Sequence, residues 1–130
     1  MSGFADSIGT VTDTLASQFF EHYAAALVAR DEKAIAAMYA VPSLILFPGQ
    51  SILVTDPGQT EEFFAAAWSQ YEGVDAADKQ MKIMGEGPGS VWADVTWSYH
   101  GKPQERFCYQ LIAGPNGYQI AVLTPLTAAP

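Results

Sequence analysis

The sequence is short of the residues on which several classes of protein depend. It has a single cysteine, Cys108, so an intrachain disulfide framework and a zinc site built on cysteines are excluded. Its two histidines lie far apart in the chain, and we expect neither a metal site nor a cofactor. Lysine and arginine number 6 against 14 acidic residues, a net charge of −8. This balance argues against nucleic acid and anionic membranes as partners, because both attract basic proteins.

The chain also lacks the marks of an exported or membrane-spanning protein. No apolar run approaches the roughly 18–20 residues of a membrane span, and the first twenty residues contain no lysine or arginine of a signal peptide. We therefore expect a cytoplasmic protein. Apolar residues make up 49% of the chain and aromatic residues 12%, which excludes intrinsic disorder. The length of 130 residues predicts one domain over residues 1–130.

Helical periodicity dominates the first half of the chain. After a lead-in over residues 1–9 that we expect to fray, the spacing predicts a helix from Thr10 to about Arg30. Its apolar stripe consists of Leu15, Phe19, Tyr23 and Leu27. A short helix follows from Asp31 and should end before Pro42, because the residue before a proline disfavours helical geometry.

A third helix is marked by its start signals. Asp56 is a suitable N-cap, Pro57 fits the first helical position, and Gln59 can close a capping box. Phe64, Trp68 and Tyr71 form its apolar face, and Gly73 is suited to the C-terminal stop. A predicted hairpin separates the second helix from the third, with strands over residues 43–47 and 51–55 and a turn at Pro48-Gly49.

After Asp78 the apolar period changes to two, and short turn clusters separate four predicted strands. They cover residues 79–85, 90–99, 105–113 and 118–123. The tail over residues 125–130 carries few order signals. Helices segregated from an antiparallel sheet define an α+β domain.

This order of elements resembles the nuclear transport factor 2-like (NTF2-like) superfamily, which includes ketosteroid isomerases and SnoaL-like cyclases. The local resemblance lies in Tyr23, in Arg30-Asp31 and in the run Ala34-Ile-Ala-Ala-Met-Tyr-Ala40. It implies three N-terminal helices packed on a strongly curved, mainly antiparallel six-strand sheet, shaped as a cone with a cavity. No characterised enzyme is matched closely.

The resemblance also allows a test for ketosteroid isomerisation. That reaction needs a carboxylate base and an oxyanion hole made of a tyrosine and a protonated aspartic acid. The two tyrosines of the family site fall on Tyr23 and Tyr39. The base falls on Phe47, which cannot take a proton, and the oxyanion acid falls on Tyr109 or Gln110. We therefore reject this activity, and whether the protein catalyses another isomerisation or elimination stays open.

Strand alternation decides which side chains face the interior. Over residues 90–99 the more apolar set should face the helices, which turns Asp94 outward to pair with Arg106 or Lys82. Over residues 105–113 we expect Phe107, Tyr109 and Leu111 inside. If the faces were inverted, Asp94 would enter the cavity and become the candidate catalytic acid or base, with His100 or Tyr99 as its partner.

The expected cavity is aromatic and holds no ionised group. Its predicted lining is Tyr23, Tyr39, Phe47, Phe64, Trp68, Trp97, Tyr99, Tyr109 and Val122. Such a lining suits a small apolar or aromatic molecule held by stacking and by one or two phenolic hydrogen bonds.

The sequence is also compatible with two alternative functions, and the resemblance bears on the oligomeric state. The first alternative is a SnoaL-like isomerase, cyclase or dehydratase that uses Asp94 with Tyr23 or Tyr39. The second is a protein-interaction module. Because superfamily members commonly associate through the outer face of the sheet, the resemblance implies a homodimer, and the residues expected on that face here are Trp92, Thr96, Cys108 and Ile112.

Overall fold

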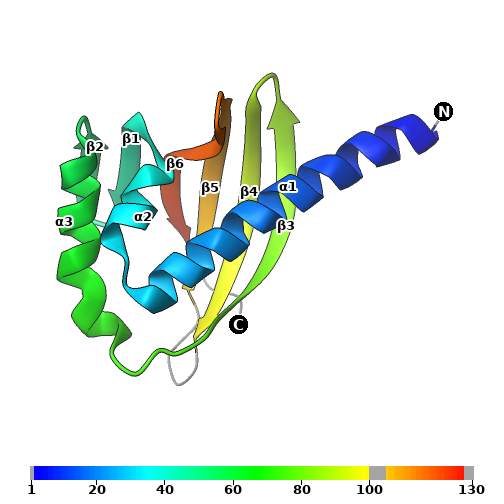
Figure 1. Ribbon diagram of the computed structural model, residues 1–130. Coiled ribbons are helices and arrows are strands. Elements are labelled where there is room, and N and C mark those ends of the chain that lie inside the picture. Colours follow the sequence, from blue (N-terminus) through cyan, green and yellow to red (C-terminus); the bar gives the residue numbers. More distant parts are fainter. Residues whose placement is uncertain (1, 100–104, 128–130) are drawn as a thin grey trace.

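The computed structural model describes residues 2–99 and 105–127, with side chains from residue 11 onward. Three α-helices and one 3₁₀ helix lie on one face of a single sheet (Figure 1). The helices are α1 (Ser2–Ala29), α2 (Glu32–Ala37), α3 (Pro57–Ala67) and the 3₁₀ helix η1 (Trp68–Tyr71).

The sheet has six strands in the order β2-β1-β6-β5-β4-β3. The strands are β1 (Tyr39–Phe47), β2 (Gln50–Val54), β3 (Ala77–Gly87), β4 (Ser90–Tyr99), β5 (Glu105–Gly114) and β6 (Gly117–Leu126). Strands β3 to β6 form the predicted antiparallel meander, while β1 and β6 pair in parallel. The predicted α+β class and the mainly antiparallel six-strand sheet are therefore confirmed. Within the described residues no helix is long and apolar enough to cross a membrane.

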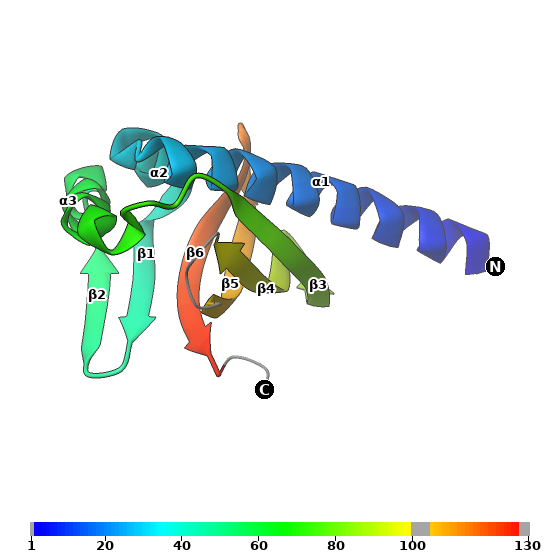
Figure 2. The same cartoon turned by 90° about the horizontal axis from the view of Figure 1, so that it is seen from below.

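The first helix is longer than its apolar stripe indicates. Helix α1 begins at Ser2 rather than at Thr10, so the expected frayed lead-in is helical, and its N-terminal part projects beyond the sheet (Figures 1 and 2). Phe19, Tyr23 and Leu27 are buried as predicted, but Leu15 is 48% exposed. Thr12 and Ala16 are 8% and 0% exposed at this level of the helix, so the buried face passes to one side of Leu15.

The second helix ends earlier than predicted. Helix α2 is capped by Asp31, whose carboxylate accepts a hydrogen bond from the Ala34 amide at 3.1 Å. It ends at Ala37, and Pro42 lies inside β1 rather than stopping the helix. The pairing of β1 with β6 is interrupted between Tyr39 and Leu44, which accommodates a residue that has no amide donor.

The predicted alternation of β4 is confirmed in full. Val91, Ala93, Val95, Trp97 and Tyr99 are buried beneath the helices, and the intervening side chains face the other way. In β5, Tyr109 and Leu111 are buried on the same inner face, and Phe107 packs against that core. Asp94 therefore lies on the outer face of the sheet.

The alternation of β6 is shifted by a bulge. Gln110 pairs with Val122, but the next residue, Leu111, pairs with Ile120, so Ala121 is an extra residue in β6. Beyond this bulge the inward side chain is Leu123, which is 3% exposed, rather than Val122. The expectation that Val122 lines the cavity rested on unbroken period-two alternation, and the bulge breaks it.

The start of α3 gives a test of local stability. Asp56 accepts from the Gly58 amide, and the Gln59 side chain accepts from the Asp56 amide at 3.0 Å, which completes the predicted capping box. We expect Asp56→Ala to lower the free energy of unfolding by about 1 kcal/mol, because the Gly58 amide at the helix start loses its acceptor. Urea denaturation measures this change. Asp75→Ala, at an exposed loop position, is the matched control, and an equal loss in both variants would contradict the assignment.

Candidate binding cavity

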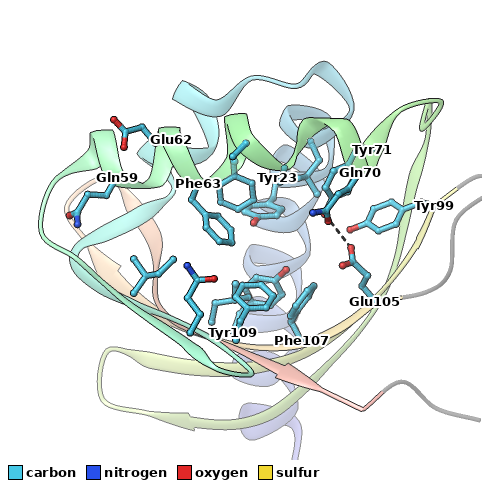
Figure 3. A pocket seen from close by; sticks show the side chains of 18 residues that line it. Tyr23, Gln59, Glu62, Phe63, Gln70, Tyr71, Tyr99, Glu105, Phe107 and Tyr109 are labelled. Carbon is cyan, nitrogen blue, oxygen red and sulfur yellow. Dashed lines mark hydrogen bonds between the residues drawn. The ribbon is translucent and has the colours of Figure 1, made fainter.

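A cavity of about 710 Å³ lies between α3 and the inner face of the sheet (Figure 3). Helix α3 and η1 form one wall, and β1, β2, β5 and β6 form the other, with α1 at the back. The apolar and aromatic part of its lining consists of Tyr23, Leu27, Phe47, Ile52, Phe63, Phe64, Ala66, Ala67, Tyr71, Tyr99, Phe107, Tyr109 and Leu123.

Five of the residues expected in the cavity lie there, namely Tyr23, Phe47, Phe64, Tyr99 and Tyr109. Figure 3 places Tyr23 and Tyr109 in the middle of the cavity and Tyr99 at one end. They come from α1, β4 and β5, so the cavity depends on elements that are far apart in the sequence.

The other four expected residues lie outside the lining. Tyr39 and Trp97 are almost fully buried behind Tyr23 and Tyr109 and belong to the packed core. Trp68 turns toward α2, where its indole N–H donates to the Glu32 carboxylate at 3.2 Å. Val122 is replaced by Leu123 because of the bulge in β6.

The hydroxyls of the buried tyrosines form hydrogen bonds with other aromatic side chains rather than with the backbone. The Tyr23 and Tyr39 hydroxyls are 2.9 Å apart and share a hydrogen bond. The Trp97 indole N–H donates to the Tyr109 hydroxyl, also at 2.9 Å. Tyr109 therefore accepts a hydrogen bond within the core while its side chain also lines the cavity. Two cavity-lining phenols are thus held in place by partners in the core.

The cavity contains a carboxylate that the sequence patterns did not indicate. Glu105, the first residue of β5, lines one end beside Tyr71 and Tyr99 (Figure 3). The Tyr71 hydroxyl donates to Glu105 Oε1 at 3.2 Å, and the rings of Tyr71 and Tyr99 are in edge-to-face contact. Alternation would have found Glu105, because it shares the inner face of β5 with Phe107 and Tyr109.

The opposite end of the cavity is also polar. Gln59 and Glu62 of α3 lie there (Figure 3), and Gln50 of β2 also lines the cavity. The expectation of a cavity without carboxyl groups is therefore wrong, because Glu105 and Glu62 stand at its two ends. The aromatic side chains occupy the stretch between them.

Asp94 is engaged on the other side of the sheet. Its two carboxylate oxygens accept from Arg106 Nε at 2.9 Å and from Nη2 at 2.6 Å, a bidentate pair across β4 and β5. Hydrogen bonding to Arg106 holds the pKa of Asp94 below its ordinary value. Tyr99 faces inward, and His100 lies outside the described residues. The candidate catalytic aspartate is thus remote from the cavity.

Cys108 lies opposite Asp94 in the register of β4 and β5 and shares the outer face. Burial raises the pKa of its thiol, and the neighbouring Asp94 carboxylate adds to this rise. A raised pKa leaves less of the nucleophilic thiolate at neutral pH. The structural interpretation of this cysteine is therefore favoured over a reactive one.

Comparison with known proteins shows the family to which the chain belongs. Residues 12–128 match the model of a family described as NTF2-like protein (DUF6841), so the chain belongs to that family. No curated protein is detectably similar to this chain in sequence.

Solved structures agree on the fold. Aln2 from a Streptomyces species is 17% identical with a TM-score of 0.68, covering 88% of this chain and 89% of that one. Kfla4162 from Kribbella flavida is 10% identical with a TM-score of 0.66, covering 93% of each chain. A DUF4783 family protein from Bacteroides ovatus is 14% identical with a TM-score of 0.61, covering 84% of this chain and 94% of that one. At these identities the likeness concerns the fold alone.

The tyrosines of the cavity and core make stability depend on alkaline pH. Burial raises the pKa of Tyr23, Tyr39, Tyr71, Tyr99 and Tyr109 above the ordinary value of 10.0. Between pH 10 and these raised values the unfolded chain loses phenolic protons that the folded chain keeps. The contribution of these phenols to the free energy of unfolding is therefore fully present below pH 10 and is lost as the pH rises above it.

We expect this coupling to be visible in a spectrophotometric titration. Phenolate absorbance at 295 nm should stay low at pH 10 and then rise together with the loss of far-ultraviolet circular dichroism, because unfolding exposes the phenols. Urea-unfolded protein, in which phenols titrate near pH 10, is the control. Ionisation of most tyrosines near pH 10 in the folded protein would contradict their burial.

Proposed function

We propose that this NTF2-like domain binds a small apolar or aromatic molecule in the cavity beneath α3. The observation that carries the proposal is the aromatic lining of a space of about 710 Å³. Volumes of roughly 300–1,000 Å³ with a mainly apolar lining and a few placed polar groups are typical of small-molecule sites. Phe47, Phe63 and Phe107 offer ring faces and edges on which a flat ligand can pack.

The phenolic hydroxyls could also orient the ligand through hydrogen bonds. The hydroxyl of Tyr109 accepts from Trp97, so it can donate its proton to an oxygen or nitrogen of the ligand. Tyr23, which lines the cavity, has a proton to offer in the same way when it accepts the hydrogen bond from Tyr39. A ligand with one hydrogen-bond acceptor near its centre would meet these groups.

The geometry favours binding over the SnoaL-like alternative built on Asp94. A general base must come within hydrogen-bond distance of the proton it removes, and Asp94 lies on the opposite face of the sheet, paired with Arg106. The protein-interaction module has no specific observation in its favour. A cytoplasmic location stays a prediction from the sequence.

Blocking the cavity tests the proposal. Ala67 lines the cavity, whereas Ala65 is exposed on the same helix and does not. We expect the neutral fluorophore N-phenyl-1-naphthylamine to bind with enhanced emission, and Ala67→Trp to weaken this binding at least tenfold because the indole fills the space. Fluorescence titration gives both dissociation constants.

Ala65→Trp is the matched control and should bind as the unmodified protein does. A second groove, lined by Phe19, Met38 and Tyr118, runs between α1 and the turn that joins β5 and β6. Binding that survives Ala67→Trp unchanged would place the fluorophore there or elsewhere and would contradict the proposal.

We further propose that the protein forms a homodimer through the outer face of the sheet. Trp92, Cys108 and Ile112 are half-buried on this face, which carries no helix (Figure 2). Light scattering after size exclusion should then give twice the chain mass of 14.0 kDa. Trp92→Glu should yield the monomer, while Val11→Glu, at an exposed site on α1 on the other side of the sheet, should not. A monomeric unmodified protein would refute the dimer.

A further inference from the structure

The charge of the cavity is of one sign. Its ionisable lining residues other than tyrosine are Glu62 and Glu105, and no lysine, arginine or histidine occurs among the described residues that line it. Within the described ranges, the ion pairs are Lys79 with Glu21 and Arg106 with Asp94, so neither cavity carboxylate is neutralised by one. Glu62 is exposed, whereas Glu105 is half-buried. A charged group partly removed from water, as Glu105 is, is stabilised by an opposite charge, and here the described protein supplies none.

The register of β5 explains why the cavity keeps this charge. Arg106 follows Glu105 directly, but alternation turns it to the outer face, where Asp94 holds it by two hydrogen bonds. The cation nearest in sequence to Glu105 among the described residues is therefore engaged on the far side of the sheet. Glu105 receives the Tyr71 hydrogen bond on Oε1, and its other oxygen accepts no hydrogen bond from a described residue.

Aromatic rings surround this carboxylate. The rings of Tyr71 and Tyr99 stand at 85° to each other with centroids 5.4 Å apart, and Phe107 follows Glu105 on the inner face of β5. Figure 3 shows Glu105 and Tyr99 side by side at the end of the cavity. Aromatic walls with a carboxylate between them suit an alkylated ammonium group, which gains from both the ring quadrupoles and the charge.

From this juxtaposition, and resting on the proposed function, we propose that the ligand is an organic cation. Its ammonium group lies beside Glu105, against the paired rings of Tyr71 and Tyr99, and its apolar body extends along Phe107 and Tyr109 beneath α3. A bare metal ion does not fit this arrangement, because Glu62 and Glu105 stand at opposite ends of the cavity (Figure 3). The net charge of −8 favours the approach of a cation over that of an anion.

Three probes of one shape test the charge preference. In (4-hydroxyphenyl)trimethylammonium a quaternary nitrogen replaces the quaternary carbon of 4-tert-butylphenol, and 4-hydroxybenzenesulfonate carries the opposite charge. Their dissociation constants are measured by calorimetry and by displacement of N-phenyl-1-naphthylamine. We expect the cation to bind about tenfold more tightly than the neutral probe, and the anion to bind more weakly than either.

Charge-removing variants locate the effect. Glu105→Gln keeps an acceptor for the Tyr71 hydroxyl but removes the charge. It should raise the dissociation constant of the cation about tenfold and change that of 4-tert-butylphenol by no more than about twofold. Glu72→Gln changes net charge equally at an exposed position outside the cavity and should alter neither. Thermal unfolding of each variant shows whether the fold is kept.

The outcomes separate this inference from the binding function on which it rests. If 4-tert-butylphenol binds in the cavity and the cation binds no better, or Glu105→Gln weakens both alike, the cation inference is wrong and the aromatic-ligand proposal stands. If only the cation binds and Ala67→Trp abolishes this binding, the inference is supported and the proposal for neutral ligands is refuted. If no probe binds, both are wrong.

Discussion

The packing of α1 against the inner faces of β4 and β5 is the constraint on which the rest of the structure depends. Phe20 and Tyr23 of α1 meet Tyr109 at centroid distances of 4.8 and 5.9 Å, and Tyr23 stacks on Trp97 at 5.9 Å. This contact requires the bulky residues of both strands to face the helix. Once they do, the polar residues between them, Asp94 among them, must face outward.

The aromatic side chains at this contact also determine where the cavity begins. Tyr23 and Tyr109 belong at once to the core and to the lining, and their hydroxyls are fixed by Tyr39 and Trp97 behind them. Beyond these rings α3 stands away from the sheet, which leaves the cavity between them. The cavity wall is therefore preorganised, since the side chains that a ligand would touch are already held by buried hydrogen bonds.

Much of the fold could be predicted from the sequence because its signals are local. Capping by Asp31 and Asp56, the turn at Pro48-Gly49 and the alternation of β4 each depend on residues a few positions apart. The candidate site was less accessible to such reasoning. The bulge at Ala121 exchanged Val122 for Leu123, because pairing with β5 and with β1 sets the register of β6. Glu105 was missed because the alternation of β5 was not extended to its first residue.

Composition and periodicity by themselves determined the class of this protein: an acidic α+β domain whose meander strands turn apolar side chains inward and Asp94 outward. These properties follow from side-chain chemistry repeated at the period of a helix or a strand. Only the tertiary structure decided what the interior contains, namely phenols that pair with one another, and carboxylates of β5 and α3 at the two ends of one cavity. The reason is geometric, since Glu62 and Glu105 come to one space only when α3 crosses the sheet.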